Sequence, residues 1–317
     1  MFVPFARRRR SWEAVASRET DETAFRSRRR FLAALGLGGL SAAVLARAGR
    51  AVAERALVRE AHDMPVLRAS RAERYADAGR PLSPSSEVVR YANFFEFGGD
   101  KRHVPARSFD FVLDPFAVAI DGLVERPGMW TLERIEALGL EERVYRHRCV
   151  EAWAMTVPWT GVPLARVLEA AGVHADARYV RFVSFDPQES GVRAPGPFPF
   201  PYYEALHIEE AAHELAFLAT GLYGHRLTPQ NGAPLRLVVP WKYGFKSAKS
   251  LVRLHVSAER PGSFWNDVAP SEYSWLANVD PRVPHPRWSQ EQERLLGSGA
   301  LVPTLPFNGY DVGGVYA

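Results

Sequence analysis

The stretch RVYRHRCVEAWAMTVPWTGVPL, residues 143–164, surrounds the only cysteine of the chain, Cys149. Residues 143–148 alternate as a β-strand does, and they include three arginines and one histidine. Positive charge near a thiol favours the thiolate, the form that attacks electrophiles and ligates soft metals. The pattern therefore indicates a functional cysteine. The alternative is a buried cysteine that only packs as a small apolar residue.

A single cysteine narrows the possible sites. It excludes an intramolecular disulfide and the multi-cysteine clusters of zinc and iron–sulfur proteins. His207 and His213 are six residues apart instead of the four that place two imidazoles on one helical face, so no zinc site is expected there. The acids between them, Glu209 and Glu210, are predicted to lie on an exposed helical face.

Three of the four lysines of the chain fall within eight residues, at Lys242, Lys246 and Lys249. An apolar run ending at Trp241 predicts a strand before them, and residues 250–257 predict another strand after them. The lysines would then lie on a connection whose ammonium and backbone NH groups bind an anion such as a phosphate. The alternative is a solvated basic loop, but three interleaved aromatic residues argue against it.

Short strands and short helices alternate without a regular pattern along the rest of the chain. Strands are predicted at 116–121 and 179–184. Helices are predicted at 131–138, capped by Thr131, and at 163–171, ended by Gly172. The pattern predicts a mixed, strand-rich α+β fold and excludes the βαβ repeat of a doubly wound sheet.

The first 53 residues resemble a twin-arginine export signal. Ser27-Arg28-Arg29-Arg30 precedes sixteen uncharged residues, 31–46, which are too few for a good membrane anchor. Ala51-Val52-Ala53 is a small-x-small site for cleavage before Glu54. We therefore expect a cleaved signal at 1–53, a single domain at 54–317, export by the twin-arginine machinery and a periplasmic location. This machinery carries folded proteins, so a cofactor loaded before export is also expected.

Composition and charge support a globular protein that does not bind nucleic acid. The chain has 317 residues, of which 47% are hydrophobic and 24% charged, as in ordinary globular domains. Residues 1–53 carry a net charge of +7, so the remainder of the chain is mildly acidic at −3. An acidic body lacks the basic surface that binds phosphate backbones, so no nucleic-acid partner is expected.

Five motifs in one order resemble the sulfite-oxidase-fold molybdenum enzymes. The motifs are YANFFEFG at 91–98, RCVEAWAMTVPWTGVPL at 148–164, PQNGAPLRLVVPWKYGFKSAKS at 229–250, HPRWSQ at 285–290 and NGY at 308–310. They resemble most closely the molybdopterin-binding catalytic subunits of periplasmic protein-methionine-sulfoxide reductase systems. The resemblance covers nearly all of residues 54–317.

The resemblance implies a mononuclear molybdenum held by the Cys149 thiolate and by one molybdopterin without an appended nucleotide. Arg148 and Glu151 flank the ligand and are expected to orient the substrate or to relay protons. The cofactor-binding positions matched by the resemblance are Asn93, Phe95, Glu96, Ser184, Asn231, Arg236, Ser247, Ala248 and Lys249.

The chain departs from the family pattern at three positions near the expected cofactor. Ala92 stands where the family often has a second asparagine, Phe95 where it has tyrosine, and Ser184 where it has threonine. The change to Ser184 keeps a hydroxyl, whereas the other two remove a polar group. None of the three affects the expected metal ligand.

The function implied by the resemblance is reduction of protein-bound methionine sulfoxide by oxygen-atom transfer to molybdenum. Because the chain has no CxxCH motif and no cysteines for iron–sulfur clusters, its electrons must come from another protein. The resemblance implies a membrane haem-b subunit that oxidises quinol and forms a heterodimer with this chain. The substrates would be oxidised periplasmic proteins.

Two alternatives remain at this stage. The first is oxidation of sulfite or a related small sulfur compound on the same fold, in which Arg146 and Arg148 would select a doubly charged substrate. The second is an exported binding protein in which Cys149 is structural and no metal is bound.

Overall fold

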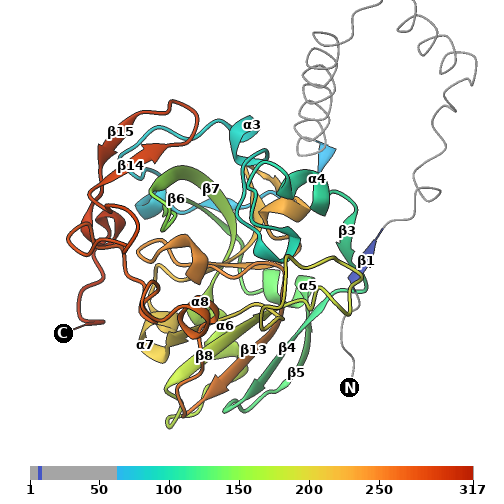
Figure 1. The fold of residues 1–317 in the computed structure, drawn as a ribbon. Helices are drawn as coiled ribbons and strands as arrows, with labels where there is room; N and C mark the ends of the chain where they lie inside the picture. The colour runs from blue at the N-terminus through green and yellow to red at the C-terminus, as the bar shows by residue number, and fades with distance from the viewer. Residues whose placement is uncertain (1–5, 9–62, 317) are drawn as a thin grey trace, which may run out of the picture.

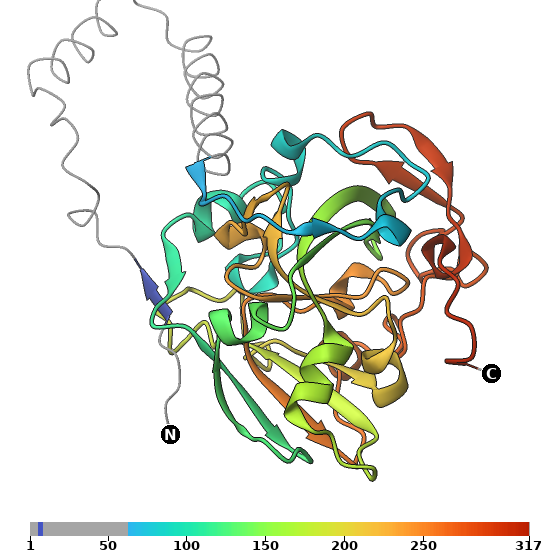
Figure 2. The same cartoon turned by 180° about the vertical axis from the view of Figure 1, so that it is seen from behind.

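The computed structural model describes residues 6–8 and 63–316 (Figure 1; Figure 2). The twin-arginine motif and the expected cleavage site lie outside these residues. Strands dominate and the helices are short, so the predicted strand-rich α+β class is confirmed. A small separate sheet pairs β1 (Ala6–Arg8) antiparallel with β3 (Phe111–Leu113). In the described part of the chain, no helix is both long and apolar enough to cross a bilayer.

The larger sheet has eight strands and is built on one long hairpin. β6 (Glu141–Arg148) pairs antiparallel over its whole length with β7 (Trp153–Pro163), from the pair Glu141 and Gly161 to the pair Arg148 and Ala154. Almost every residue of β7 is buried, which is typical of a strand covered on both faces. The other strands are β2 (Ser70–Arg71), β10 (Phe217–Leu222), β11 (His225–Arg226), β12 (Arg236–Val238), β14 (Gln292–Leu295) and β15 (Leu301–Pro303).

The smaller sheet lies at the bottom of Figure 1 and has five strands in the order β5-β4-β13-β8-β9. Their bounds are β4 (Ala117–Gly122), β5 (Gly128–Thr131), β8 (Tyr179–Ser184), β9 (Tyr203–His207) and β13 (Leu251–Ser257). Only β4 and β13 are parallel neighbours. The strand predicted at 179–184 is confirmed as β8, where every second side chain points into the core.

Within residues 63–316 there are six short helices, and the two predicted ones are present. They are α3 (Ser85–Val88), α4 (Val104–Ser108), α5 (Leu132–Glu136), α6 (Leu164–Ala171), α7 (Ile208–Ala212) and α8 (Phe264–Val268). α6 buries one apolar stripe and ends at Gly172, whose φ of 70° lies in the left-handed region. The Thr131 hydroxyl caps α5 by accepting from the backbone NH of Arg134. α5 ends two residues before the predicted 138, because the chain there turns with i to i+3 bonds.

One apolar core joins the two sheets and supports a set of loops beside it. Three tryptophans at its centre, Trp130, Trp159 and Trp241, are at most 1% exposed. Five 3₁₀ helices interrupt the loops: η1 (Glu73–Tyr75), η2 (Phe95–Phe97), η3 (Pro229–Asn231), η4 (Gly244–Lys246) and η5 (Pro306–Gly309). η2, η3 and η4 come together at the turn between β6 and β7, where a pocket forms.

Candidate active site

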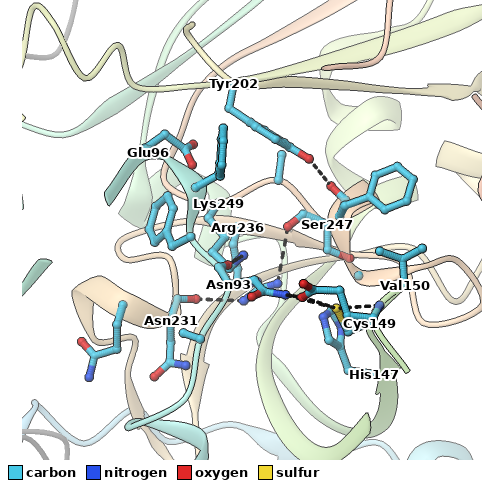
Figure 3. Close-up of a pocket in the computed structure, with 18 of the residues that line it drawn as sticks. Asn93, Glu96, His147, Cys149, Val150, Tyr202, Asn231, Arg236, Ser247 and Lys249 are labelled. Carbon is cyan, nitrogen blue, oxygen red and sulfur yellow. Dashed lines mark hydrogen bonds between the residues drawn. The ribbon is translucent and has the colours of Figure 1, made fainter. Parts of the chain in front are cut away.

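Most of the pocket lining comes from four separate segments of the chain (Figure 3). They are residues around η2, the turn from β6 into β7, η3 with the residues that follow it, and the connection from η4 to β13. Tyr202, Trp265 and Tyr273 complete the lining. Of the nine predicted cofactor-binding residues, eight line the pocket, and Cys149 and Glu151 line it too. The structure therefore brings together residues that lie up to 156 positions apart, such as Asn93 and Lys249.

Cys149 lies where β6 ends, with its sulfur held by polar groups from two segments. The side chain of Asn93 donates to Sγ over 3.1 Å, and the backbone NH of Glu151 donates over 3.4 Å. Glu151 itself accepts from Asn93 at 3.0 Å and pairs with Lys101 at 2.8 Å. Ala152 completes the turn with a φ of 59°, which a residue with a side chain seldom adopts. The sulfur thus has a fixed orientation toward the pocket.

Burial, and not the neighbouring arginines, sets the protonation of the Cys149 thiol. Desolvation raises its pKa to about 12, and the Glu151 carboxylate acts in the same direction. Lys101 and Arg148 act in the opposite direction, as predicted for nearby cations, but desolvation outweighs them. Arg143 pairs with Glu141, and Arg146 donates to backbone carbonyls. A metal ion binding here would have to displace the thiol proton.

Arg148 does not line the pocket, and its predicted contact with substrate is not supported. Alternate residues of a strand face opposite ways, so Cys149 and His147 face the pocket while Arg148 faces the other side. There the Arg148 guanidinium is fully buried and lies 2.9 Å from Glu293. It also donates to the carbonyl oxygen of Cys149. Arg148 therefore acts on the ligand residue through its backbone.

Two of the three clustered lysines do not face the pocket, which corrects the prediction of a three-lysine anion site. Lys242 pairs with Glu210 at 2.5 Å, and Lys246 pairs with Glu204 at 2.9 Å, with all four side chains completely buried. The prediction that Glu210 lies on an exposed face is wrong for the same reason. Only Lys249 lines the pocket, so the cluster combines two structural ion pairs with one residue of the site.

Lys249 and Arg236 form the positive end of the pocket. Lys249 donates to the carbonyl of Asn93 at 2.6 Å, and Arg236 donates to the carbonyl of Asn231 at 3.0 Å. Among the described residues neither cation has a carboxylate within ion-pair distance. Burial lowers the pKa of Arg236 to about 9 and also lowers the pKa of Lys249. An anion bound between them would restore both charged forms.

The pocket is lined by Glu96 and Phe95, whereas Ser184 lies behind it. Glu96 is buried with Oε1 unpartnered, and this burial raises the pKa of its carboxyl. Phe95 lines the pocket and packs edge-on against Trp265 at 4.8 Å between ring centres. Ser184 lies behind the pocket, where its hydroxyl donates to the carbonyl of Lys249. Ser184 therefore supports a pocket residue and does not line the pocket itself.

The pocket contains residues that were not predicted. His147 is buried with Nδ1 unpartnered, and burial together with Arg236 holds its pKa well below the usual range, so the ring is neutral. Gln230 also has an unpartnered atom, Oε1. His147 lies two residues before Cys149, so strand parity could have identified it. The remaining unpredicted residues form mostly aromatic walls: Tyr91, Trp153, Tyr202, Phe245, Trp265 and Tyr273.

Comparison with known proteins assigns the family. Residues 103–265 match the model of the oxidoreductase molybdopterin-binding domain, and the chain belongs to this family. Its members bind the molybdenum–molybdopterin cofactor, so the predicted cofactor is confirmed at the level of the family. The match includes Cys149, Arg236 and Lys249 but begins after Asn93 and Glu96.

Among solved structures, the chain is similar to the sulfane dehydrogenase SoxCD from Paracoccus pantotrophus. The two share 20% sequence identity with a TM-score of 0.42. The alignment covers 53% of this chain and 49% of the other, so this chain spans about half the length of that protein.

The residues of the pocket fit the family's cofactor. Arg236 is buried and Lys249 partly buried, and within the described residues neither has a carboxylate at ion-pair distance, which suits a phosphate group. Unpartnered atoms of Glu96, His147 and Gln230 are available for the polar groups of a pterin. The Cys149 sulfur is a soft ligand of the type that molybdenum requires. These residues would hold the cofactor with its phosphate at the Arg236 end and its metal at Cys149.

Proposed function

We propose that this chain reduces protein-bound methionine sulfoxide to methionine, with Cys149 as the protein ligand of the molybdenum. The bound cofactor supplies the oxygen-atom and electron chemistry. The net reaction consumes two electrons and two protons and releases a thioether and one water. The chain's own residues have to place the sulfoxide, exclude competing anions and deliver the protons.

The observation that carries the proposal is that no cation among the described residues contacts the Cys149 sulfur, and that the nearby Lys101 is paired with Glu151. The polar side chains that contact its sulfur are the amide of Asn93 and the carboxylate of Glu151. Arg146 and Arg148, which would have selected sulfite, both point away from the pocket. A negative carboxylate beside the metal position disfavours a dianion such as sulfite and tolerates a neutral sulfoxide.

The walls of the pocket also suit a methionine side chain. Tyr91 and Trp153 pack edge-on at 5.0 Å, and Trp265 and Tyr273 lie 5.3 Å apart between ring centres. Aromatic rings make favourable contacts with the sulfur of methionine and cover its apolar methylene groups. A small inorganic anion gains nothing from such walls.

Glu151 is the residue we propose for proton delivery. Its Oε2 lies 3.7 Å from the Cys149 sulfur, and its side chain is 40% exposed, so it contacts both the pocket and solvent. Lys101 and Asn93 hold the carboxylate in place from two sides. Glu151 would take a proton from water and donate it to the oxygen that leaves the sulfoxide.

The location and partners that we propose follow from the sequence. The twin-arginine motif at 28–30 supports export of the loaded protein to the periplasm. Among the described residues, no cluster of three or more histidine, cysteine or acidic side chains could hold a second metal. Electrons would therefore be delivered by a membrane haem-b subunit that oxidises quinol and binds this chain as a heterodimer.

The proposal is tested with the full chain isolated after export from a host that makes molybdopterin. Molybdenum content is measured first, and about one metal per chain is expected from a single thiolate ligand. Reduction of methionine sulfoxide in an oxidised protein and oxidation of sulfite are then measured on the same sample with artificial electron carriers. Faster turnover of sulfite than of the oxidised protein would overturn the proposed substrate.

Cys149→Ser and Glu151→Gln separate the two proposed roles. The serine variant should keep the wild-type melting temperature and lose the activity. The glutamine variant should keep its molybdenum and lose about 10²–10⁴-fold in kcat, as expected for removal of a general acid. If the wild-type protein contains no molybdenum, and both variants match it in molybdenum content and in activity, the alternative of a binding protein with a structural Cys149 is supported.

A further inference from the structure

A distant segment of the chain holds the turn that carries Cys149. We define the clamp as residues 285–294, which begin with the HPRWSQ motif and end in β14. The carbonyl of Val150 accepts two hydrogen bonds from the clamp, one from Trp288 Nε1 and one from Gln290 Nε2, both at 2.8 Å. The carbonyl of Ala152 accepts a third, from the backbone NH of Arg294 at 2.9 Å.

The clamp also acts on Cys149 through Arg148. The guanidinium of Arg148 donates to the Cys149 carbonyl, and the clamp fixes the guanidinium itself. Gln290 Oε1 accepts from Arg148 at 2.9 Å, and Glu293 lies 2.9 Å from its Nε. Gln290 thus uses both ends of its amide, one on Val150 and one on Arg148. All three carbonyls at 149, 150 and 152 are therefore bound by the clamp or by an arginine that it holds.

The turn needs this support because of its own geometry. Ala152 adopts a positive φ, which a residue with a side chain keeps only when its surroundings enforce it. Trp288 is held in turn by His285, since their rings stack in parallel at 3.7 Å. The stacking on His285 therefore holds the Trp288 indole from outside the turn, and the Gln290 amide links the turn to the buried Arg148.

From these contacts we infer that Trp288 and Gln290 are positioning residues, which fix the orientation of the Cys149 sulfur toward the metal. The inference rests on Cys149 as the metal ligand but not on the identity of the substrate. Residues that orient a metal ligand without touching the metal tune its bond geometry and its reactivity. Removal of the hydrogen bond to Val150 from either Trp288 or Gln290 should loosen the turn in the apoprotein and change the metal environment in the loaded protein.

Trp288→Phe and Trp275→Phe form a matched pair of variants for the test. Phenylalanine at 288 keeps a ring for stacking on His285 and removes only the bond to Val150. Trp275 has the same kind of bond, from its Nε1 to the carbonyl of Pro261 at 2.9 Å, but it does not line the pocket. Trp275→Phe therefore controls for the loss of one indole bond elsewhere. Gln290→Met gives a second variant within the clamp.

The first measurement uses apoprotein from a host that lacks molybdopterin. Since Cys149 is the only cysteine, the rate of alkylation by iodoacetamide reports on this turn alone. Trp288→Phe and Gln290→Met should each be alkylated about fivefold faster than the wild type, as expected when one hydrogen bond that opposes local opening is lost. Trp275→Phe should react at the wild-type rate. Thermal unfolding identifies any variant that has not folded.

The second measurement uses protein loaded with cofactor, in which the electron paramagnetic resonance spectrum of the one-electron-reduced metal reports on the sulfur orientation. The spectrum should change for Trp288→Phe and stay the same for Trp275→Phe. Wild-type alkylation rates and an unchanged spectrum in both folded clamp variants would overturn the inference. Because alkylation requires neither metal nor substrate, a failure of the proposed methionine sulfoxide activity would leave this result intact.

Discussion

Four cations lie in the stretch from Arg236 to Lys249, three of them buried and Lys249 partly buried, and they form two pairs with opposite surroundings. Lys242 and Lys246 each contact a buried carboxylate, from Glu210 and Glu204. Arg236 and Lys249 donate to backbone carbonyls and have no carboxylate within ion-pair distance among the described residues. The two pairs come from one stretch of sequence. Arg236, Lys242 and Lys246 are at most 1% exposed, whereas Lys249 is partly buried.

The difference shows which buried charges belong to the fold and which belong to the site. A buried charge without a partner costs several kcal/mol, so a protein keeps one only where something else compensates it. Lys242 and Lys246 are compensated within the chain and therefore stabilise the fold. We propose that Arg236 and Lys249 are compensated by an anion that arrives with the cofactor. Loss of a paired cation should reduce stability, whereas loss of an unpaired one should reduce cofactor binding.

The largest effect is expected when a paired cation is removed. Lys246→Met leaves the Glu204 carboxylate buried without its cation, and it should lower the free energy of unfolding by about 3–5 kcal/mol. Urea denaturation of the apoprotein measures this change. The double variant Lys246→Met with Glu204→Leu should recover most of the loss, since it removes both charges together. A single variant as stable as the wild type would contradict the structural role of this pair.

Removal of a cation without a carboxylate partner should leave the stability of the apoprotein intact and weaken cofactor binding. Arg236→Met takes away a desolvated charge that stacks over Trp159 and leaves an apolar side chain of similar length. The apoprotein should be at least as stable as the wild type, while cofactor affinity should fall about 10–100-fold. Molybdenum content and thermal unfolding, measured on the same preparation, check both parts. Full metal loading would show that the phosphate does not lie at Arg236.

A pH-dependent effect of smaller size is expected for Lys249 in the apoprotein. Burial lowers its pKa in the folded state below the ordinary 10.5, so the unfolded chain binds a proton that the folded chain releases. Stability should therefore rise with pH from the lowered folded pKa up to about 10.5. Lys249→Met should be more stable than the wild type below this window, and the gap should close across it. Equal slopes for both proteins would contradict the lowered pKa.

The smallest effect is expected for a paired cation that is not fully buried. Lys101 contacts Glu151 at 2.8 Å, but the two side chains are 20% and 40% exposed. Lys101→Met should change the free energy of unfolding by less than about 1 kcal/mol, because solvent screens such pairs. Urea denaturation of this variant beside Lys246→Met tests whether burial of an ion pair decides how much free energy of unfolding is lost with its cation. If Lys101→Met loses as much as Lys246→Met, burial does not decide the loss.

Local sequence patterns predicted much of the fold but not the pairing of charges. Residues 179–184 alternate apolar and polar side chains, and they form β8 with these bounds. α6 was predicted to within one residue because a proline and a glycine mark its ends. In contrast, the partners of Lys242 and Lys246 lie more than thirty residues earlier in the chain. No local rule connects them, since the contact depends on how α7 and β9 pack against η4.

The candidate site shows the same division between local and distant information. Cys149, Arg236 and Lys249 were found because their sequence neighbourhoods are unusual and because the motifs resemble a known family. Arg148 is next to Cys149 in the sequence, which predicts a role in the pocket. Neighbouring residues of a strand face opposite sides, however, and Arg148 faces away from the pocket. His147, on the correct face, was treated as one of the cations. Ser184 shows that a motif position can support the site from behind without lining it.

The clamp also has a consequence for how the protein is made. A ribosome releases the segments that form the pocket walls, at 91–99, 147–155, 230–236 and 244–249, before it has synthesised Trp288 and Gln290. A nascent or truncated chain could therefore assemble the walls but would lack the groups that fix Val150. Firm retention of the cofactor would then be reserved for translation products that extend past residue 294.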